Sequence, residues 1–113
     1  MPFRLSAEAE EDIVSIAEQG IRNFGSLAAK RYHDELFDVL DLIAASPRMT
    51  RERHEISPPV RIHTFKAHLV IYRINDDGSV LVIRIRRGHE DGLETPSNAP
   101  QYRVLQLRLW TSR

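Results

Sequence analysis

The stretch VRIHTFKAHLVIYRINDDGSVLVIRIRR, residues 60–87, decides the fold. It contains three runs rich in β-branched and aromatic side chains, which are typical of strands. The dipeptide KA at 66–67 separates the first run from the second, and the polar turn NDDG at 75–78 separates the second from the third. Short links of this kind join antiparallel neighbours. The stretch therefore predicts a three-stranded antiparallel meander.

Two amphipathic helices are predicted before the meander. Residues 7–24 repeat apolar side chains at steps of three and four, directly after Ser6, which is a favourable N-cap. Gly25 supplies a C-cap glycine, and Ser26 is expected to cap a second helix with a stronger apolar stripe. Because the chain reverses within so few residues, the two helices are expected to pack as a hairpin.

The remaining segments complete an α+β domain with the order β-α-α-β-β-β. Residues 3–5 predict a short N-terminal strand, and the charged, proline-flanked residues 48–59 predict a mobile, partly basic loop. The helical hairpin is expected to cover one face of an antiparallel sheet. A chain of 113 residues suits a single core, which we assign to residues 1–91. For the C-terminal extension, residues 92–113, an added strand, a helical turn and a loosely held tail stay open.

Composition argues against several function classes. The chain has no cysteine, which removes disulfides, thiolate nucleophiles and Cys-ligated zinc. The N-terminus has no apolar run of the length of a signal peptide or membrane span, so a cytoplasmic location and no membrane association are expected. There is no Gly-rich phosphate loop and no nucleophile elbow, and no cofactor is expected. His63 and His68 lack a nearby carboxylate, so no metal site is expected.

The net charge of zero hides a segregation of charge along the chain. Residues 5–21 contain five acids and no Lys or Arg, whereas residues 60–89 contain six Lys or Arg, three His and two Asp. The C-terminal half is therefore expected to present a basic surface, suited to nucleic acid or to an acidic partner. Because the total charge is balanced, strong nonspecific DNA binding is not expected. Direct sequence-specific DNA binding is not expected either.

Four stretches taken together resemble the ParE branch of the ParE/RelE toxins. They are FRLSAEAE at 3–10, IAASPR at 43–48, VIYRI at 70–74 and IRIRRGHED at 83–91. The similarity covers roughly residues 2–91, and the joint pattern is what makes it specific. Family members often have His where this chain has Arg87 and an aromatic residue where it has Gly92, and they usually stop soon after. The extension falls outside the resemblance.

The resemblance implies the toxin half of a bacterial type II toxin–antitoxin pair. A cognate ParD-like antitoxin would silence it by wrapping around it in a hetero-oligomer such as a heterotetramer. ParE-like members poison DNA gyrase, whereas RelE-like members cut mRNA in the ribosomal A site. Three readings stay open: a gyrase poison, which the closest motifs favour and which is not an enzyme; a ribosome-dependent endoribonuclease; and an inactive module that only binds antitoxin.

Each reading has its own candidate residues. Val14, Ile21 and Tyr32 are predicted to contact the antitoxin, because the helices have wider apolar faces than a three-stranded sheet needs. A further set is predicted to contact the target: Arg84, Arg86 and Arg87. In the ribonuclease reading, cations and an acid for the phosphate would instead come from Arg84, Arg86 and His89.

The last strand is expected to divide its side chains between two faces. Strand alternation puts Arg84 and Arg86 on one face and Ile83 and Ile85 on the other. The competing interpretation is that the two arginines simply form the solvated face of a strand near the sheet edge. The basic segment 48–54 is a further candidate for target contact, although charged loops are usually only solvated.

Overall fold

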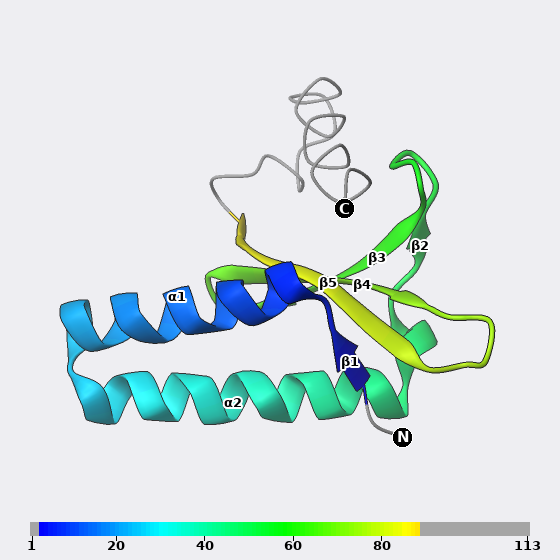
Figure 1. The fold of residues 1–113 in the computed structure, drawn as a ribbon. Coiled ribbons are helices and arrows are strands. Elements are labelled where there is room, and N and C mark those ends of the chain that lie inside the picture. The colour runs from blue at the N-terminus through cyan, green and yellow to red at the C-terminus, as the bar shows by residue number, and fades with distance from the viewer. Residues whose placement is uncertain (1–2, 89–113) are drawn as a thin grey trace.

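A computed structural model describes residues 3–88 and has the expected α+β architecture (Figure 1). Its elements in chain order are β1 (Phe3–Leu5), α1 (Ala7–Phe24), α2 (Ser26–Ala45), the 3-10 helix η1 (Pro47–Met49), β2 (Glu52–Arg53), β3 (Val60–Phe65), β4 (His68–Ile74) and β5 (Val80–Arg87). The predicted N-terminal strand, helical hairpin and meander are confirmed. The alternatives left open for residues 92–113 lie outside the described residues.

The five strands form one sheet in the order β1-β5-β4-β3-β2. β3, β4 and β5 are antiparallel neighbours, as predicted, but β1 runs parallel to β5, with Phe3 opposite Val80. The sheet is therefore mixed, and the expectation of an antiparallel sheet is wrong at this edge. A parallel neighbour needs a long crossover connection, and here the helical hairpin and the rest of the meander separate β1 from β5.

Local signals set the helix ends. The backbone N–H of Ala9 donates to Ser6 Oγ over 2.9 Å, and this hydroxyl in turn donates to the carbonyl of Ile83 over 2.6 Å. Gly25 has φ 91° and ψ 161°, and its N–H donates to the carbonyl of Ile21. Ser26 was expected to be the N-cap of the second helix, but it is already its first residue and Gly25 occupies the cap position. Gly25 thus serves both helices.

The segment after α2 is more ordered than the predicted loop. It contains η1 and the two-residue β2, which pairs with the start of β3. The Tyr72 hydroxyl from the middle of the sheet donates to the carbonyl of Pro47 over 2.8 Å and lies 2.9 Å from Thr50 Oγ1. Arg61 also donates to the Thr50 carbonyl. Because these bonds come from residues distant in sequence, the local pattern did not predict them.

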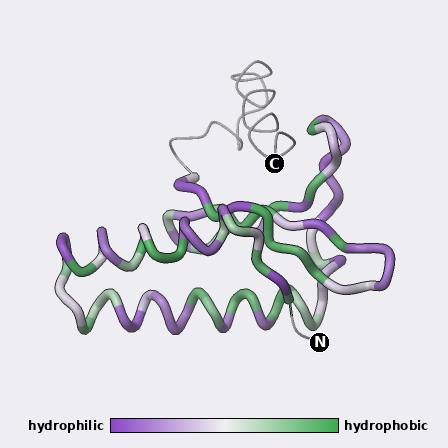
Figure 2. The backbone as a smooth tube through the Cα atoms, viewed as in Figure 1, coloured by the Kyte–Doolittle hydropathy of each residue, from purple (hydrophilic) through white to green (hydrophobic). Residues whose placement is uncertain are grey.

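Apolar side chains on the two faces of the sheet form two clusters. The larger cluster lies between the sheet and the hairpin and contains Ala9, Ile13, Leu36, Leu40, Ile43, Phe65, Val70, Tyr72, Val80, Val82 and Ile85. The smaller contains Ile56, Val60, Ile62, Leu69 and Ile71, with Ile83 packed against it. Figure 2 shows the hydrophobic segments of both helices alternating with hydrophilic ones, as expected for helices that bury one side.

A β-bulge in β5 changes which side chains share a face. Ile71 lies opposite Arg84 and Tyr72 lies opposite Val82, so Ile83 is an extra residue in β5. Ile85 consequently packs in the cluster under the helices, whereas Ile83 packs against the other cluster. The prediction that Ile83 and Ile85 share a face is wrong, because simple alternation does not account for the bulge.

Candidate functional site

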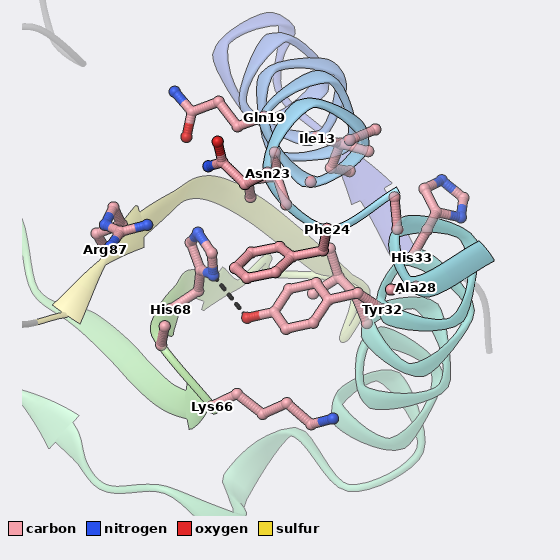
Figure 3. A pocket seen from close by; sticks show the side chains of 16 residues that line it. Ile13, Gln19, Asn23, Phe24, Ala28, Tyr32, His33, Lys66, His68 and Arg87 are labelled. Carbon is pink, nitrogen blue, oxygen red and sulfur yellow. Dashed lines mark hydrogen bonds between the residues drawn. The ribbon is translucent and has the colours of Figure 1, made fainter. Parts of the chain in front are cut away.

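A cleft of about 440 Å³ opens between the C-terminal half of α1 and the N-terminal half of α2, and it reaches the turn between β3 and β4. Figure 3 shows it from close by. Its lining combines apolar helix residues with a few polar groups: Ile13, Ile16, Ala17, Gln19, Gly20, Asn23, Phe24, Ala28, Ala29, Tyr32, His33, Leu36, Lys66, Ala67, His68 and Arg87. Concave, mostly apolar surfaces with a small polar set are the usual form of a binding site.

Small residues on the facing helix sides create the cleft. Ala17 and Gly20 come from α1, and Ala28 and Ala29 from α2. A Cβ added at Gly20 would lie 3.2 Å from the Cβ of Ala29, so the two helices approach closely there. Beyond this contact the short side chains leave the space that larger residues would fill. Phe24 stands at the open end with 76% of its surface exposed.

The inner end of the cleft is polar. The Tyr32 hydroxyl and His68 Nδ1 share a hydrogen bond of 2.7 Å, drawn as a dashed line in Figure 3. Lys66 Nζ lies 5.6 Å from the centre of the Tyr32 ring and forms an ion pair with Glu35 of α2. Burial raises the pKa of Tyr32, while a backbone hydrogen bond from Ala67 and the nearby cations oppose the rise. The phenol therefore stays protonated at neutral pH.

Only one of the three residues predicted to contact the antitoxin lies in this cleft. Tyr32 lines it and is half-buried. Val14 and Ile21 are 56% and 52% exposed on α1 and are absent from the lining. They are seven residues, or two helical turns, apart, so both lie on one side of α1, next to the side that lines the cleft. Tyr32 belongs to α2, whereas Val14 and Ile21 lie on α1 outside the cleft, so the three residues do not line one site.

The three arginines predicted to contact the target are in different surroundings. Arg84 Nε and Nη2 donate to the two carboxylate oxygens of Asp12 over 2.9 and 3.1 Å, and the two side chains are only 13% and 16% exposed. Arg86 is half-buried and lies opposite Leu69, whereas Arg87 is exposed and lines the cleft. The third candidate of the ribonuclease reading, His89, lies outside the described residues.

Sequence reasoning missed the partner of Arg84. Asp12 also accepts the backbone N–H of Ile85 over 2.9 Å, so one carboxylate holds α1 against the bulged part of β5. In the sequence, Asp12 is one of the five acids of residues 5–21. Its position between apolar Ile13 and the charged side of α1 was the available signal for a partly buried acid. The signal does not identify the partner, because Arg84 is 72 residues away.

Within residues 3–88, no group of three or more acidic or histidine side chains is arranged to hold a metal ion. His68 Nδ1 shares a hydrogen bond with the Tyr32 hydroxyl. His63 Nδ1 is buried without a hydrogen-bond partner. Neither helix of this part of the chain is long and apolar enough to cross a membrane.

Comparison with known proteins gives consistent results. A family model described as the ParE toxin of the type II toxin–antitoxin system parDE matches residues 3–92. Toxin ParE1 of Mycobacterium tuberculosis, from strains CDC 1551 / Oshkosh and ATCC 25618 / H37Rv, is 30% identical over 83 residues. That alignment covers 74% of this chain and 85% of the relative.

A solved structure has the same fold. A chain from the structure described as the chromosomal ParDE TA system from P. aeruginosa superposes with a TM-score of 0.67 at 17% sequence identity. The match covers 77% of this chain and 95% of that chain. At this level of identity the similarity establishes the fold, including the helical hairpin packed against the mixed sheet.

Proposed function

Because the chain belongs to the ParE toxin family of type II toxin–antitoxin systems, we propose that it inhibits bacterial growth by poisoning DNA gyrase. A ParD-like antitoxin would neutralise it, and both proteins would act in the cytoplasm. The observation that carries the proposal is the family match over residues 3–92, which includes every described element. The family model that matches is described as a ParE toxin.

The surroundings of Arg84 favour the gyrase poison over the ribonuclease. A cation that stabilises a phosphate in a transition state must point its donors at that phosphate. The Nε and Nη2 donors of Arg84 are directed at Asp12 instead. A ribonuclease would need this ion pair to open before Arg84 could reach RNA. A poison that works by binding needs no such rearrangement.

The antitoxin surface that we propose is the cleft together with the adjoining apolar side of the hairpin. Phe24 and Leu27, 76% and 73% exposed, lie at the turn between the helices, and Val14 and Ile21 continue along α1. Contiguous exposed apolar surface of this kind marks an interaction site. An amphipathic segment could insert its apolar side chains here, as in other groove-binding complexes.

Expression in bacteria, followed by two assays, tests the target. The chain expressed alone should arrest growth, and co-expression of the antitoxin from the adjacent gene should restore it. Purified protein should inhibit gyrase supercoiling, while primer extension on mRNA from arrested cells should show no codon-phased cuts. Codon-phased cleavage would establish the ribonuclease reading instead. Normal growth with soluble, folded protein would leave only the antitoxin-binding module.

The arginines separate the two activities further. In a ribonuclease, replacing Arg84 and Arg86 with Ala should reduce the rate about a hundredfold, because a lost transition-state cation costs about 3 kcal/mol. In a gyrase poison, the same double substitution should weaken toxicity only modestly, because Arg84 is already paired with Asp12 and the half-buried Arg86 would contribute about 1 kcal/mol or less as a surface charge. We expect the modest effect, after correction for the amount of folded protein.

A pair of substitutions tests the antitoxin surface. Phe24→Asp puts a charge at the mouth of the cleft and should weaken antitoxin binding about tenfold or more, since a lost aromatic anchor costs about 1–4 kcal/mol. Leu42→Asp is the matched control, because Leu42 is 49% exposed on α2 but does not line the cleft. Equal affinities of both variants, measured by titration calorimetry, would place the antitoxin elsewhere.

A further inference from the structure

The cleft lies directly beside the point where the described part of the chain ends. Arg87, the last residue of β5, lines it, and the N–H of Gly88 donates to the carbonyl of Ala67 over 2.9 Å. Ala67 also lines the cleft. The backbone at residue 88 is therefore fixed at the rim, and the 25 residues that follow, 113 − 88, start from there.

The C-terminal segment 101–113 has the composition of a chain that binds an apolar surface. Six of its side chains are large and apolar: Tyr102, Val104, Leu105, Leu107, Leu109 and Trp110. It also contains three arginines and no acid. Apolar side chains at this density gain free energy when they are removed from water. The cleft offers apolar surface, and Phe24 at its mouth is exposed.

The lining of the cleft contains Lys66 and Arg87 and, among the described residues, no acid. α1 forms one wall and contains five acids, but none of them is among the lining residues. The three arginines of segment 101–113 therefore have no acidic partner in the lining, and the placement rests on burial of the apolar side chains and on the tether at Gly88.

The connecting residues are long enough for the segment to reach the whole cleft. An extended chain spans about 3.3 Å per residue, so the 14 residues from 88 to 102 span at most about 46 Å. α1 has 18 residues and is therefore about 27 Å long. The family match ends at residue 92, so segment 101–113 is an addition to the matched domain.

We propose that segment 101–113 binds in the cleft of its own chain and competes there with the antitoxin. The competition rests on the proposed function, whereas the intramolecular binding does not. A tethered segment has an effective concentration of about 1 mM. If its intrinsic dissociation constant is about 0.1 mM, it weakens binding of any competitor to the cleft about tenfold. The extension would thus lower the antitoxin affinity of this toxin.

Trp110 allows a direct test on the full-length chain without antitoxin, because it is the only tryptophan. Its emission should be blue-shifted in native protein relative to the same protein in urea. Phe24→Asp should shift it back towards the solvent-exposed value, and Leu42→Asp should not. Emission that is already solvent-exposed, or that Phe24→Asp leaves blue-shifted, would overturn the proposal.

Dilution separates the intramolecular site from exchange between two copies. The emission and the sedimentation coefficient should both be independent of protein concentration. A blue shift that disappears on dilution together with a dimer would overturn the proposal, since the segment would then bind a second copy.

Competition is tested with Leu107→Asp combined with Leu109→Asp in the full chain. This variant should bind the purified antitoxin about tenfold more tightly than the unchanged protein. Equal affinities would overturn the competition. If neither protein binds antitoxin, the proposed function fails, whereas the response of Trp110 to Phe24→Asp still decides the intramolecular site.

Discussion

At the scale of single residues, Asp12 determines how α1 is attached to the sheet. Its carboxylate accepts two hydrogen bonds from Arg84 and one from the backbone of Ile85. The Ile85 N–H lies just after the bulge, where β1 no longer pairs with β5. Without Asp12, a partly buried N–H and a partly buried guanidinium would each lose this hydrogen-bond acceptor. Such groups are costly to leave unsatisfied.

Replacing Asp12 should therefore destabilise the fold strongly. Asp12→Ala should lower the free energy of unfolding by about 3 kcal/mol, because it removes the carboxylate from a largely buried ion pair and leaves the Arg84 charge there without it. Glu11→Ala is the control, since Glu11 is an exposed acid on the same helix. Urea denaturation should show a lower midpoint with an unchanged slope. A midpoint equal to that of the control would mean that the ion pair is not structural.

Tyr32 gives a pH-dependent prediction. Its pKa is raised above the ordinary value of 10.0 by burial, so the folded state favours the protonated phenol. This contribution is fully present below about pH 10 and is lost as the pH rises through the raised pKa. Tyr32→Phe removes the bond to His68 and should cost about 1 kcal/mol at neutral pH. The difference from wild type should shrink above pH 10 in urea titrations, and a constant difference would contradict the assigned shift.

At the scale of elements, the hairpin depends on the backbone of Gly25. Its φ of 91° and ψ of 161° fall in a region that is essentially restricted to glycine. Gly25→Ala should cost about 2 kcal/mol in the free energy of unfolding. Gly20→Ala should change stability little, because its gain in helix propensity of about 1 kcal/mol is offset by the contact with Ala29. Thermal melts of both variants check this, and similar losses would argue against backbone strain at Gly25.

The sequence predicted those elements whose signals are local. Ser6, Gly25 and the turn at 75–78 mark ends of helices and strands with residue types that have direct backbone roles. β2 was not predicted, because a strand of two residues has no alternation and forms only through its neighbour β3. The bulge at Ile83 was missed for a similar reason. Its position depends on pairing with Ile71 and Tyr72 rather than on the composition of β5.

At the scale of the whole molecule, the site was only partly predictable. The apolar excess of the hairpin predicts Tyr32 as an antitoxin contact, because periodicity shows which side of a helix is apolar, and the structure places Tyr32 in the lining of the cleft. Periodicity could not show that Lys66 of the β3–β4 turn and His68 and Arg87 of the sheet close one end of the cleft. Contacts between such distant residues are set by how the hairpin packs on the sheet. Single-residue patterns do not contain that information.

The last prediction concerns the boundary of the folded unit. We expect a chain shortened to residues 1–91 to fold by itself, because the hairpin, the strands and the larger cluster all lie within residues 3–88. A domain of this size should unfold in one cooperative transition. If segment 101–113 binds the cleft with the tenfold effect proposed above, its removal lowers the free energy of unfolding by about 1.4 kcal/mol. Urea denaturation of the two chains, followed by circular dichroism, measures this difference. A larger loss, or a broad non-cooperative transition, would show that residues 92–113 belong to the core of the domain. The extension could then leave the cleft to an antitoxin only if the domain partly unfolded.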